Sequence, residues 1–295
     1  MKTYKNIDEF ILDVFPLEHE KIIKEVKTDE EKKIERLNNT FTRELEEALG
    51  NFDRAIEECT QAIKDDPNDA DGYYNRGLAY DKKGDIDKAI DDFTQAISLD
   101  PKNAMAYNYR GLAYAKKDDF DKAIDDFNQS IRLDPNEAWP YNMRGNAYKN
   151  KSDLDRAIDD YDQALRLDPK YSTVYDNRGR AYNEKGDHDR ALEDFEQVLK
   201  LDPDNAAAYN SRAWTYAQHL KRNYGDALSD INQALALDPG DANFIDTRGW
   251  VYLGMGDYEN AIADFEEALR IDPDLNDSKD GLEQARQLQE KGKKE

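Results

Sequence analysis

The chain has 295 residues, of which 36% are charged and 38% hydrophobic, a composition lean for one compact core but suited to an elongated body whose elements each keep a solvated face. Its 65 acidic residues outnumber the 42 basic ones and give a formal net charge of −23, so we expect neither nucleic acid nor an anionic membrane surface as partner. The single cysteine, Cys59, excludes an intrachain disulfide and a zinc site of paired thiolates.

Residues 1–35 carry apolar side chains at helical spacing but no uninterrupted apolar core of a secretory leader. Ile7, Phe10, Ile11 and Val14 follow one helical face, and Pro16 stops that helix. We expect this segment to form a helical cap over the element that follows; the alternative is a docking or self-inhibitory arm. No stretch of the chain approaches the roughly 18 apolar residues of a membrane span, so we expect a cytoplasmic protein.

A proline that follows an acidic residue recurs along most of the chain. These prolines are Pro67, Pro101, Pro135, Pro169, Pro203, Pro239 and Pro273. They lie about 34 residues apart, and only the step from Pro203 to Pro239 is longer, by two. Proline cannot continue a helix and disfavours helix in the residue before it, so each one ends a helix in register. A fixed period of this length indicates a solenoid of stacked repeats.

Each unit contains two amphipathic helices, as residues 104–137 show. The first, helix A, covers Ala104–Lys117, and the second, helix B, begins after Asp119. Apolar and small residues recur at spacings of three, four and seven. They are Tyr107, Gly111 and Tyr114 in helix A and Phe120, Ala123, Phe127 and Ile131 in helix B. Between the helices, a glycine ends helix A and an aspartate caps helix B, as at Gly84, Gly186 and Gly256.

Counted from Ala104 as position 1, the units share a small residue at position 8, tyrosine at position 11, alanine at position 20 and the closing proline. This pattern resembles the tetratricopeptide repeat. The resemblance implies an all-α fold, a right-handed superhelical solenoid of stacked antiparallel helix pairs. We expect seven units over residues 36–273: 36–69 (degenerate), 70–103, 104–137, 138–171, 172–205, 206–241 (with a two-residue insertion) and 242–275. Residues 275–290 resemble the family's C-terminal solvating helix, and 291–295 form a tail.

Three departures from the pattern stand out. The first unit has Arg43 and Glu46 where glycine and tyrosine are expected, as terminal repeats often do. Two extra residues in 218–224 should lengthen the turn between the helices of the sixth unit. Position 7, apolar in the family, is arginine in every full unit, and position 23 is then aspartate; this predicts structural Arg–Asp bridges between helices A and B, with a ladder of arginines for acidic ligands as the alternative.

No constellation of catalytic or metal-ligating residues stands out. His19, His188 and His219 lie in different units without a metal-ligand spacing and are interpreted as surface residues. Cys59 occupies a packing position, so we expect it to be buried; the alternative is a reactive thiol. We therefore expect no cofactor, no metal and no enzymatic activity.

The resemblance also implies a binding surface. In the family, helix A lines a concave groove, and positions 2, 5, 9, 12 and 13 usually point into it. The candidate peptide-binding residues are Tyr74, Leu78, Asn108, Leu112, Trp139, Asn142, Asn146, Asp176, Arg180, Asn210, Trp214, Asp246 and Trp250. Trp214 and Trp250 either bind a ligand or only pack between neighbouring A helices. No position 2 or 6 of a full repeat is Lys or Arg, so the family's clamp for chaperone tails is not expected.

These observations predict a protein-interaction scaffold that binds a peptide or helix of a protein partner in its groove. Two alternatives stay open: a structural solenoid that assembles into a homo-oligomer, and a regulatory subunit of a separate enzyme.

Overall fold

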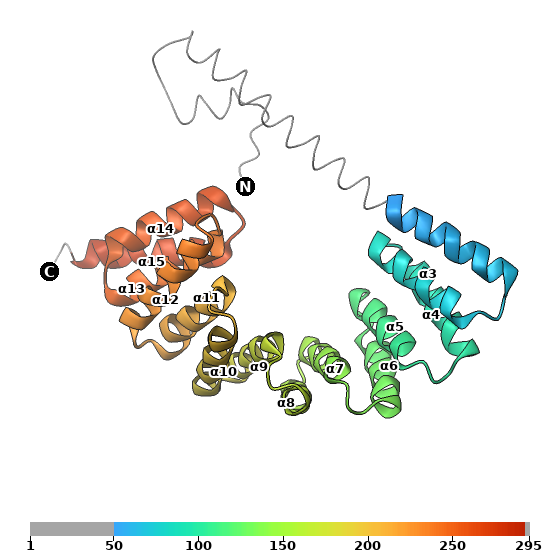
Figure 1. The fold of residues 1–295 in the computed structure, drawn as a ribbon. Helices are drawn as coiled ribbons and strands as arrows, with labels where there is room; N and C mark the ends of the chain where they lie inside the picture. The colour runs from blue at the N-terminus through green and yellow to red at the C-terminus, as the bar shows by residue number, and fades with distance from the viewer. Residues whose placement is uncertain (1–49, 293–295) are drawn as a thin grey trace, which may run out of the picture. The chain divides into compact units, whose positions relative to one another are not determined.

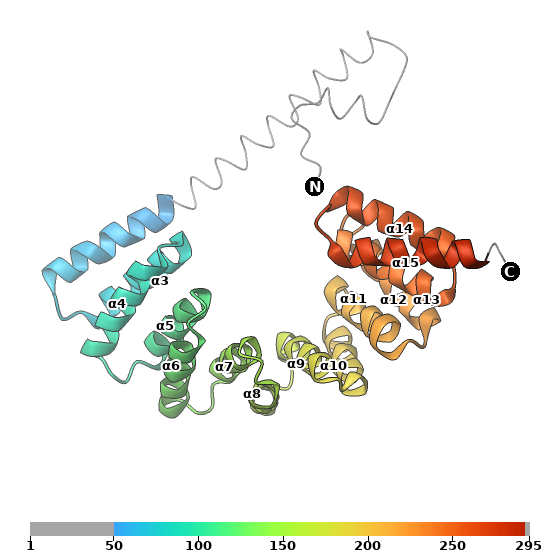
Figure 2. The same ribbon diagram turned by 180° about the vertical axis from the view of Figure 1, so that it is seen from behind.

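The computed structural model describes residues 50–292, and every regular element in that range is a helix (Figures 1 and 2). A helix over residues 50–65 comes first. The helices that follow are α3 (Ala70–Lys83), α4 (Ile86–Leu99), α5 (Ala104–Lys116), α6 (Phe120–Leu133), α7 (Ala138–Asn150), α8 (Leu154–Leu167), α9 (Ser172–Lys185), α10 (His188–Leu201), α11 (Ala206–Trp214), η1 (Thr215–Leu220), α12 (Tyr224–Leu237), α13 (Ala242–Met255), α14 (Tyr258–Ile271) and α15 (Asn276–Gly292). The expected N-terminal cap and the A helix of the first unit, with Arg43 and Glu46, lie outside the described residues.

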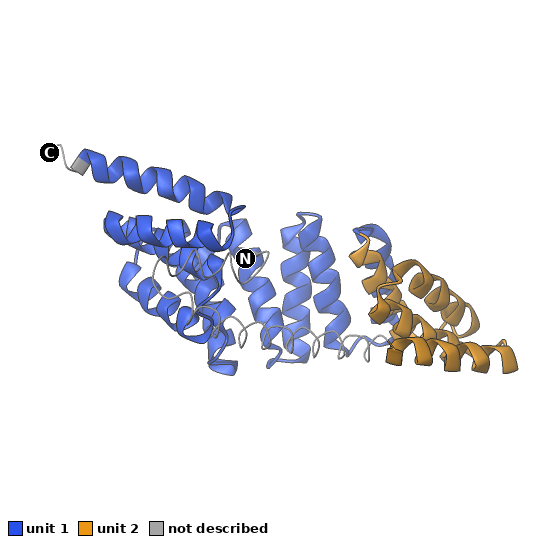
Figure 3. Cartoon of the chain, turned by 90° about the horizontal axis from the view of Figure 1, so that it is seen from above, with its two compact units in different colours: residues 1, 118–295 blue, residues 2–117 orange. Residues whose placement is uncertain are grey.

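The chain divides into two compact units (Figure 3). The N-terminal unit comprises residues 2–117, of which 50–117 are described. The C-terminal unit comprises residue 1 and residues 118–295, of which 118–292 are described. The division falls between α5 and α6. In both units consecutive helices pair with each other, and the odd-numbered helix of each pair, with η1 continuing α11, supplies the A-helix residues.

Aspartates and left-handed residues set the helix ends at the turns between A and B helices. Asp153 and Asp187 each accept a hydrogen bond from a backbone amide of the first turn of the B helix. Gly186 ends α9 with φ of +87°, but Ser152 occupies the equivalent turn after α7 with φ of +60°. A side chain is strained in this region, which glycine enters without steric strain.

A large aromatic ring fills the centre of most repeats. Phe195 on α10 is fully buried, and its ring lies directly against Gly179 on α9. A Cβ atom added at Gly179 would lie 2.9 Å from the Cε1 atom of Phe195, closer than real contacts allow. The equivalent rings are those of Phe93, Tyr161 and Phe265, each against a glycine at position 8. The small residue at position 8 is therefore a requirement of close helix packing.

The two extra residues of the sixth unit are shared between a helix and a turn. Helix α11 continues without a break into the π-helix η1, and residues 221–223 then lead into α12, where the fifth unit uses only 186–187. The expected longer turn is therefore only part of the outcome. Lys221 and Asn223 adopt left-handed backbone conformations, with φ of +48° and +56°.

Helix α15 covers the last repeat. It packs mainly on α14 and also reaches α13, and it buries Ser278 and Ala285 completely. Gly281 lies over the ring of Phe265, where a Cβ atom would approach Cζ to 2.5 Å. Figure 1 shows α15 beside α14.

Candidate binding surface

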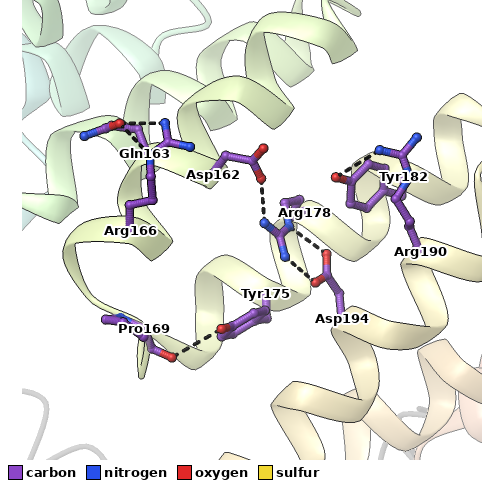
Figure 4. Close-up of polar contacts among 9 residues, drawn as sticks. All are labelled: Asp162, Gln163, Arg166, Pro169, Tyr175, Arg178, Tyr182, Arg190 and Asp194. Atoms are coloured by element: carbon purple, nitrogen blue, oxygen red, sulfur yellow. Dashed lines mark hydrogen bonds and ion pairs between the residues drawn. The ribbon is translucent and has the colours of Figure 1, made fainter.

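The arginines of position 7 form the predicted bridges between A and B helices. In the fifth repeat, Nε and Nη2 of Arg178 donate to the two carboxylate oxygens of Asp194, at 2.9 and 2.6 Å (Figure 4). The same bidentate hydrogen bonding joins Arg76 to Asp92, Arg144 to Asp160, Arg212 to Asp230 and Arg248 to Asp264. The structure confirms these bridges as structural, because both partners are largely covered and engage each other.

The third nitrogen of several of these arginines reaches the preceding repeat, which the sequence alone did not reveal. Nη1 of Arg178 donates to Asp162 at 2.5 Å, and Nη1 of Arg144 donates to Asn128 at 2.5 Å. In the N-terminal unit, Nη1 of Arg76 donates to Thr60 at 3.1 Å. Each of these arginines therefore ties three helices together, its own pair and the B helix before it.

Burial and pairing act in opposite directions on the acids of these bridges. Burial raises the pKa of Asp194, and the hydrogen bonds from Arg178 only partly offset that effect. Burial acts to lower the pKa of Arg178, but its hydrogen bonds to Asp194 and Asp162 outweigh that effect, so the pKa of Arg178 is raised. The Nε and Nη2 atoms of these guanidinium groups are committed to carboxylates within the chain.

A second ladder of ion pairs connects neighbouring repeats. A lysine at the end of an A helix binds an aspartate 30 positions earlier, in the first turn of the preceding B helix. The pairs are Lys83–Asp53 and Lys117–Asp87 in the N-terminal unit and Lys151–Asp121 and Lys185–Asp155 in the C-terminal unit. After the insertion, Arg222 takes this role and binds Asp189 at 2.6 Å. The constant spacing between these lysines and aspartates in the sequence was the signal that could have revealed the ladder.

The candidate residues of the N-terminal unit are mostly covered. Tyr74 packs against Phe93 and Tyr109 at 6.0 Å between ring centroids, and burial raises the pKa of its hydroxyl to about 12. Asn108 is only 1% exposed. Leu78 and Leu112 are half-buried. The described conformation leaves little polar surface for a ligand at these positions.

In the C-terminal unit, the candidates on α7 make contacts within the protein. Asn142 is 1% exposed, and its Oδ1 accepts a hydrogen bond of 3.0 Å from Nδ2 of Asn177 on α9. Asn146 accepts a hydrogen bond of 2.7 Å from the hydroxyl of Tyr161. Trp139 is half-buried and packs edge-to-face on Phe127. The two amides therefore connect helices.

Helix α9 carries the one exposed candidate, Arg180, and α11 carries Asn210 and Trp214, which are half-buried. The side chain of Arg180 is 46% exposed and donates from Nε to Oδ2 of Asp176 at 2.8 Å. The other oxygen of Asp176 is covered and has no hydrogen-bond partner among the described residues, and the same is true of Oδ1 of Asn210. Trp214 is half-buried on α11, one residue before η1. We refer to Asp176, Arg180, Asn210 and Trp214 as the α9–α11 patch.

Asp246 and Trp250 on α13 lie against α15. Asp246 is 5% exposed and accepts a hydrogen bond from Ser278. Trp250 packs on Phe265 at 5.4 Å and on Trp214 at 6.5 Å between ring centroids, both edge-to-face. It belongs to the apolar cluster that includes Leu282 of α15. In this conformation Trp250 is thus a packing residue of the last repeat. Trp214 contacts that cluster through the ring of Trp250.

Two further features differ from their sequence interpretation. His219 is exposed and His188 is half-buried, in keeping with surface residues, but their rings stack with centroids 4.4 Å apart, across the junction of the fifth and sixth repeats; His19 lies outside the described residues. Nδ1 of His188 also lies 3.1 Å from Oδ1 of Asn183. Cys59 is half-buried rather than buried, and burial raises the pKa of its thiol, which lowers the thiolate fraction.

Neither a membrane-spanning helix nor a metal site occurs within residues 50–292. None of the helices there combines the length and the apolar character required to cross a membrane. Within the same range, no three His, Cys, Asp or Glu side chains are arranged to hold a metal ion.

Comparison with known proteins gives a consistent family assignment. A tetratricopeptide repeat model matches residues 70–103, 104–137 and 138–171, and related tetratricopeptide models match 46–84, 160–193, 179–219 and 216–289. No curated protein matches the chain.

Solved structures show the same fold. A chain of the Cut9–Hcn1 heterotetramer of APC/C is 23% identical with a TM-score of 0.66; the match covers 80% of this chain but only 46% of that one. A tetratricopeptide repeat protein from Parabacteroides merdae is 21% identical with a TM-score of 0.61, over 87% and 98% of the two chains. YrrB, described as having an unusual peptide-binding site, is 25% identical with a TM-score of 0.54, over 65% and 97%.

Proposed function

Because the chain belongs to the tetratricopeptide repeat family, whose members are protein-interaction scaffolds, we propose that it binds an extended segment of a partner protein along the α9–α11 patch. The observation that carries the proposal is the guanidinium of Arg180, which is 46% exposed at position 9 of α9 and is held there by Asp176. The other oxygen of Asp176 and Oδ1 of Asn210, at position 5 of consecutive A helices, are covered and have no hydrogen-bond partner among the described residues, as is also true of Oδ1 of Asn108. An acceptor without a donor costs about 1–3 kcal/mol, so a movement of side chains on binding that brings these oxygens to the backbone N–H groups of an extended peptide would remove this cost.

The patch also offers a charge and an apolar surface. Arg180 is half exposed and can bind a carboxylate or a backbone carbonyl of the ligand, and Trp214 provides a flat aromatic face. Anchor residues of this kind, tryptophan and arginine, contribute most of the affinity in protein interfaces. YrrB supports the proposal as a structural relative with a peptide-binding site of its own.

The ligand is therefore expected to be a protein segment that presents its backbone, in a cytoplasmic partner. The proposed function involves neither catalysis nor a cofactor. The repeated charged framework, of which Arg178 and Asp194 are one pair, holds helices together.

Selection from a random peptide display library on the purified chain tests the proposal. Selected peptides should bind at least about thirtyfold more weakly to Trp214→Ala or Asn210→Ala variants, the effect of a ~2 kcal/mol hot spot. Leu201→Ala is the matched control, since Leu201 is 40% exposed at the end of a B helix and lies outside the patch. Selected peptides that bind all variants equally would show that the patch is not the site.

The two alternatives give different results. A homo-oligomeric solenoid would show a mass above that of the monomer in light scattering. The Leu201→Ala and Trp214→Ala variants would both keep this higher mass. A regulatory subunit would change the activity of a separate enzyme, and this effect would be lost together with peptide binding only if the same patch serves both purposes.

A further inference from the structure

The carboxylate of Asp246 is buried beneath the C-terminal helix. Ser278, on α15, is fully buried and donates its hydroxyl to Oδ1 of Asp246 at 2.5 Å. This bond joins residues that are 32 positions apart and connects α13 directly to α15. A buried carboxylate is normally bound to a cation or to several donors. Among the described residues, Ser278 is the only side chain that forms a hydrogen bond with Asp246.

The charged groups of α15 do not compensate for the burial of Asp246. Asp277, next to Ser278, is negatively charged. Besides burial, which raises the pKa of Asp246 most, the charge of Asp277 repels a negative charge on Asp246 and so raises that pKa further. Lys279, the cation next along the helix, bonds to Asn276 instead.

The other helices packed on α13 add no free cation. The cation of α13, Arg248, binds Asp264 on α14. The cation of α14, Arg270, binds Glu267 on the same helix, and the remaining charges of α14, Glu259 and Glu266, are negative. Arg212 on α11 and Asp230 on α12 also form a pair. On η1, the titratable ring of His219 stacks on a second histidine.

This environment favours the protonated carboxyl. Burial raises the pKa of Asp246 to about 6, and the hydrogen bond from Ser278 offsets only part of the increase. When α15 leaves, the carboxyl returns to water, where the ordinary value is about 3.9. The docked state of α15 therefore binds a proton more tightly than the undocked state does.

Few apolar side chains hold α15 in place. Leu282 and Ala285 join the cluster around Phe265 and Trp250, and Gly281 permits the close approach to Phe265. The rest of the helix is largely polar and exposed. Two residues of the candidate surface, Asp246 and Trp250, lie under this contact.

We propose that α15 is a displaceable lid over the C-terminal end of the candidate surface, and that the Asp246–Ser278 contact is a latch that closes more tightly in acid than at neutral pH. The regulatory meaning of the lid rests on the proposed function, since opening it extends the α9–α11 patch to Asp246 and Trp250. The latch itself needs no ligand, so the two proposals can fail separately.

The direction of the effect follows from proton linkage. The pKa of Asp246 is higher when α15 is docked than when it is undocked. Docking of α15 is therefore weakest above pH 6, and it strengthens as the pH falls towards the pKa of the undocked state. With pKa values of about 6 and about 3.9, the docking constant at pH 5 should be about tenfold that at pH 7.5.

Hydrogen exchange of the full chain, corrected for intrinsic exchange rates, measures this constant. Amides around Ala285 should be about tenfold better protected at pH 5 than at pH 7.5. Asp246→Asn should remove the pH dependence and leave α15 protected at both values, because the neutral amide resembles the protonated acid in shape. Asp280→Asn is the matched control: it removes an exposed carboxylate from the same helix and should retain the tenfold change.

Ser278→Ala provides a second variant in case Asp246→Asn does not fold. It should lower the protection of α15 at both pH values and leave that of α9 and α10 unchanged. Protection of wild-type α15 that is equal at pH 5 and 7.5, or an Asp246→Asn variant with the same pH dependence as the wild type, would overturn the latch. Peptide binding to the α9–α11 patch is measured independently and would be unaffected by that result.

Discussion

At the scale of single residues, the arginine of position 7 explains both a departure from the family pattern and the connection between repeats. Arg178 holds Asp194 with two nitrogens and Asp162 with the third (Figure 4). The carboxylate of Asp194 is removed from water, so the bridge is costly to break from one side. A buried ion pair adds little net stability by itself, but each partner requires the other.

Arg178→Leu should therefore lower the free energy of unfolding by about 3–5 kcal/mol, because it leaves the Asp194 side chain, 4% exposed, without its cation. The double variant Arg178→Leu/Asp194→Leu should cost less than the sum of the single variants. Urea unfolding measures both. Arg166→Leu is the control: its guanidinium binds Gln163 on the exposed face of α8 (Figure 4), and its loss should cost under about 0.5 kcal/mol. Equal costs for Arg178→Leu and Arg166→Leu would contradict the structural role.

The same variant should have a stronger pH dependence than the wild type, in which the pKa of Asp194 is already raised. Without Arg178, nothing offsets the burial that already raises the pKa of Asp194. The folded state of Arg178→Leu then binds a proton more tightly than the unfolded chain, so its stability should rise as the pH falls from neutral towards the ordinary range of Asp. Unfolding midpoints at pH 7 and pH 5 measure this change, and Arg178→Leu/Asp194→Leu should not show it.

At the scale of helices and turns, equivalent turn positions share a left-handed backbone conformation but carry residues that differ in how much strain this conformation causes. The turn after α9 uses Gly186 at φ of +87°, and the turn after α7 places Ser152 at φ of +60°. Left-handed backbone costs an L-residue roughly 1–2 kcal/mol. Part of this cost is recovered because a chain with serine loses less entropy on folding than it would with glycine.

Ser152→Gly should consequently raise the free energy of unfolding by about 0.5–1 kcal/mol, as measured by denaturant unfolding. Ser152→Ala is the control, because it removes the hydroxyl but keeps the Cβ atom and hence the strain. A gain in Ser152→Ala as large as that in Ser152→Gly would show that the hydroxyl, and not the backbone conformation, is responsible.

The helices and the Arg–Asp bridges could be predicted from the sequence because both repeat with the period of the fold. Helix A of residues 104–117, for example, is observed over Ala104–Lys116. The accessibility of the candidate residues could not be predicted, because it depends on what the neighbouring repeat places over them. Asn142 is covered through Asn177 and Asp246 through Ser278, and in both cases the covering residue belongs to a later part of the chain.

At the scale of the whole molecule, the helix contacts within each compact unit of the described residues join helices of the same repeat or of adjacent repeats. Consecutive helices account for most of the helix contacts, together with α13 and α15 at the end of the chain. The free energy of unfolding of such an array is approximately the sum of the stability of each repeat and of the interfaces between adjacent repeats. A destabilising substitution in one repeat should therefore affect mainly that repeat and its neighbours.

Phe195→Ala tests this locality. Removing a fully buried ring should cost about 3–5 kcal/mol. Hydrogen exchange should show the loss of protection in α9 and α10 and in the helices that touch them, α7, α8, α11 and η1, whereas residues 50–117 should remain as in the wild type. Leu201→Ala, at a 40% exposed site on the same helix, should change little. A uniform loss along the chain would mean that the array unfolds as one cooperative body.

The π-helix η1 has a consequence for how this array could have changed during evolution. Because η1 absorbs part of the extra length inside a helix, and Arg222 forms the ion pair with Asp189, the insertion leaves the contacts between the fifth and sixth repeats in place. A change of chain length, normally the most disruptive event for a periodic protein, becomes local at this point. The end of helix A in the sixth repeat is thus a natural place to graft a foreign loop, since the array already accommodates an irregular length there.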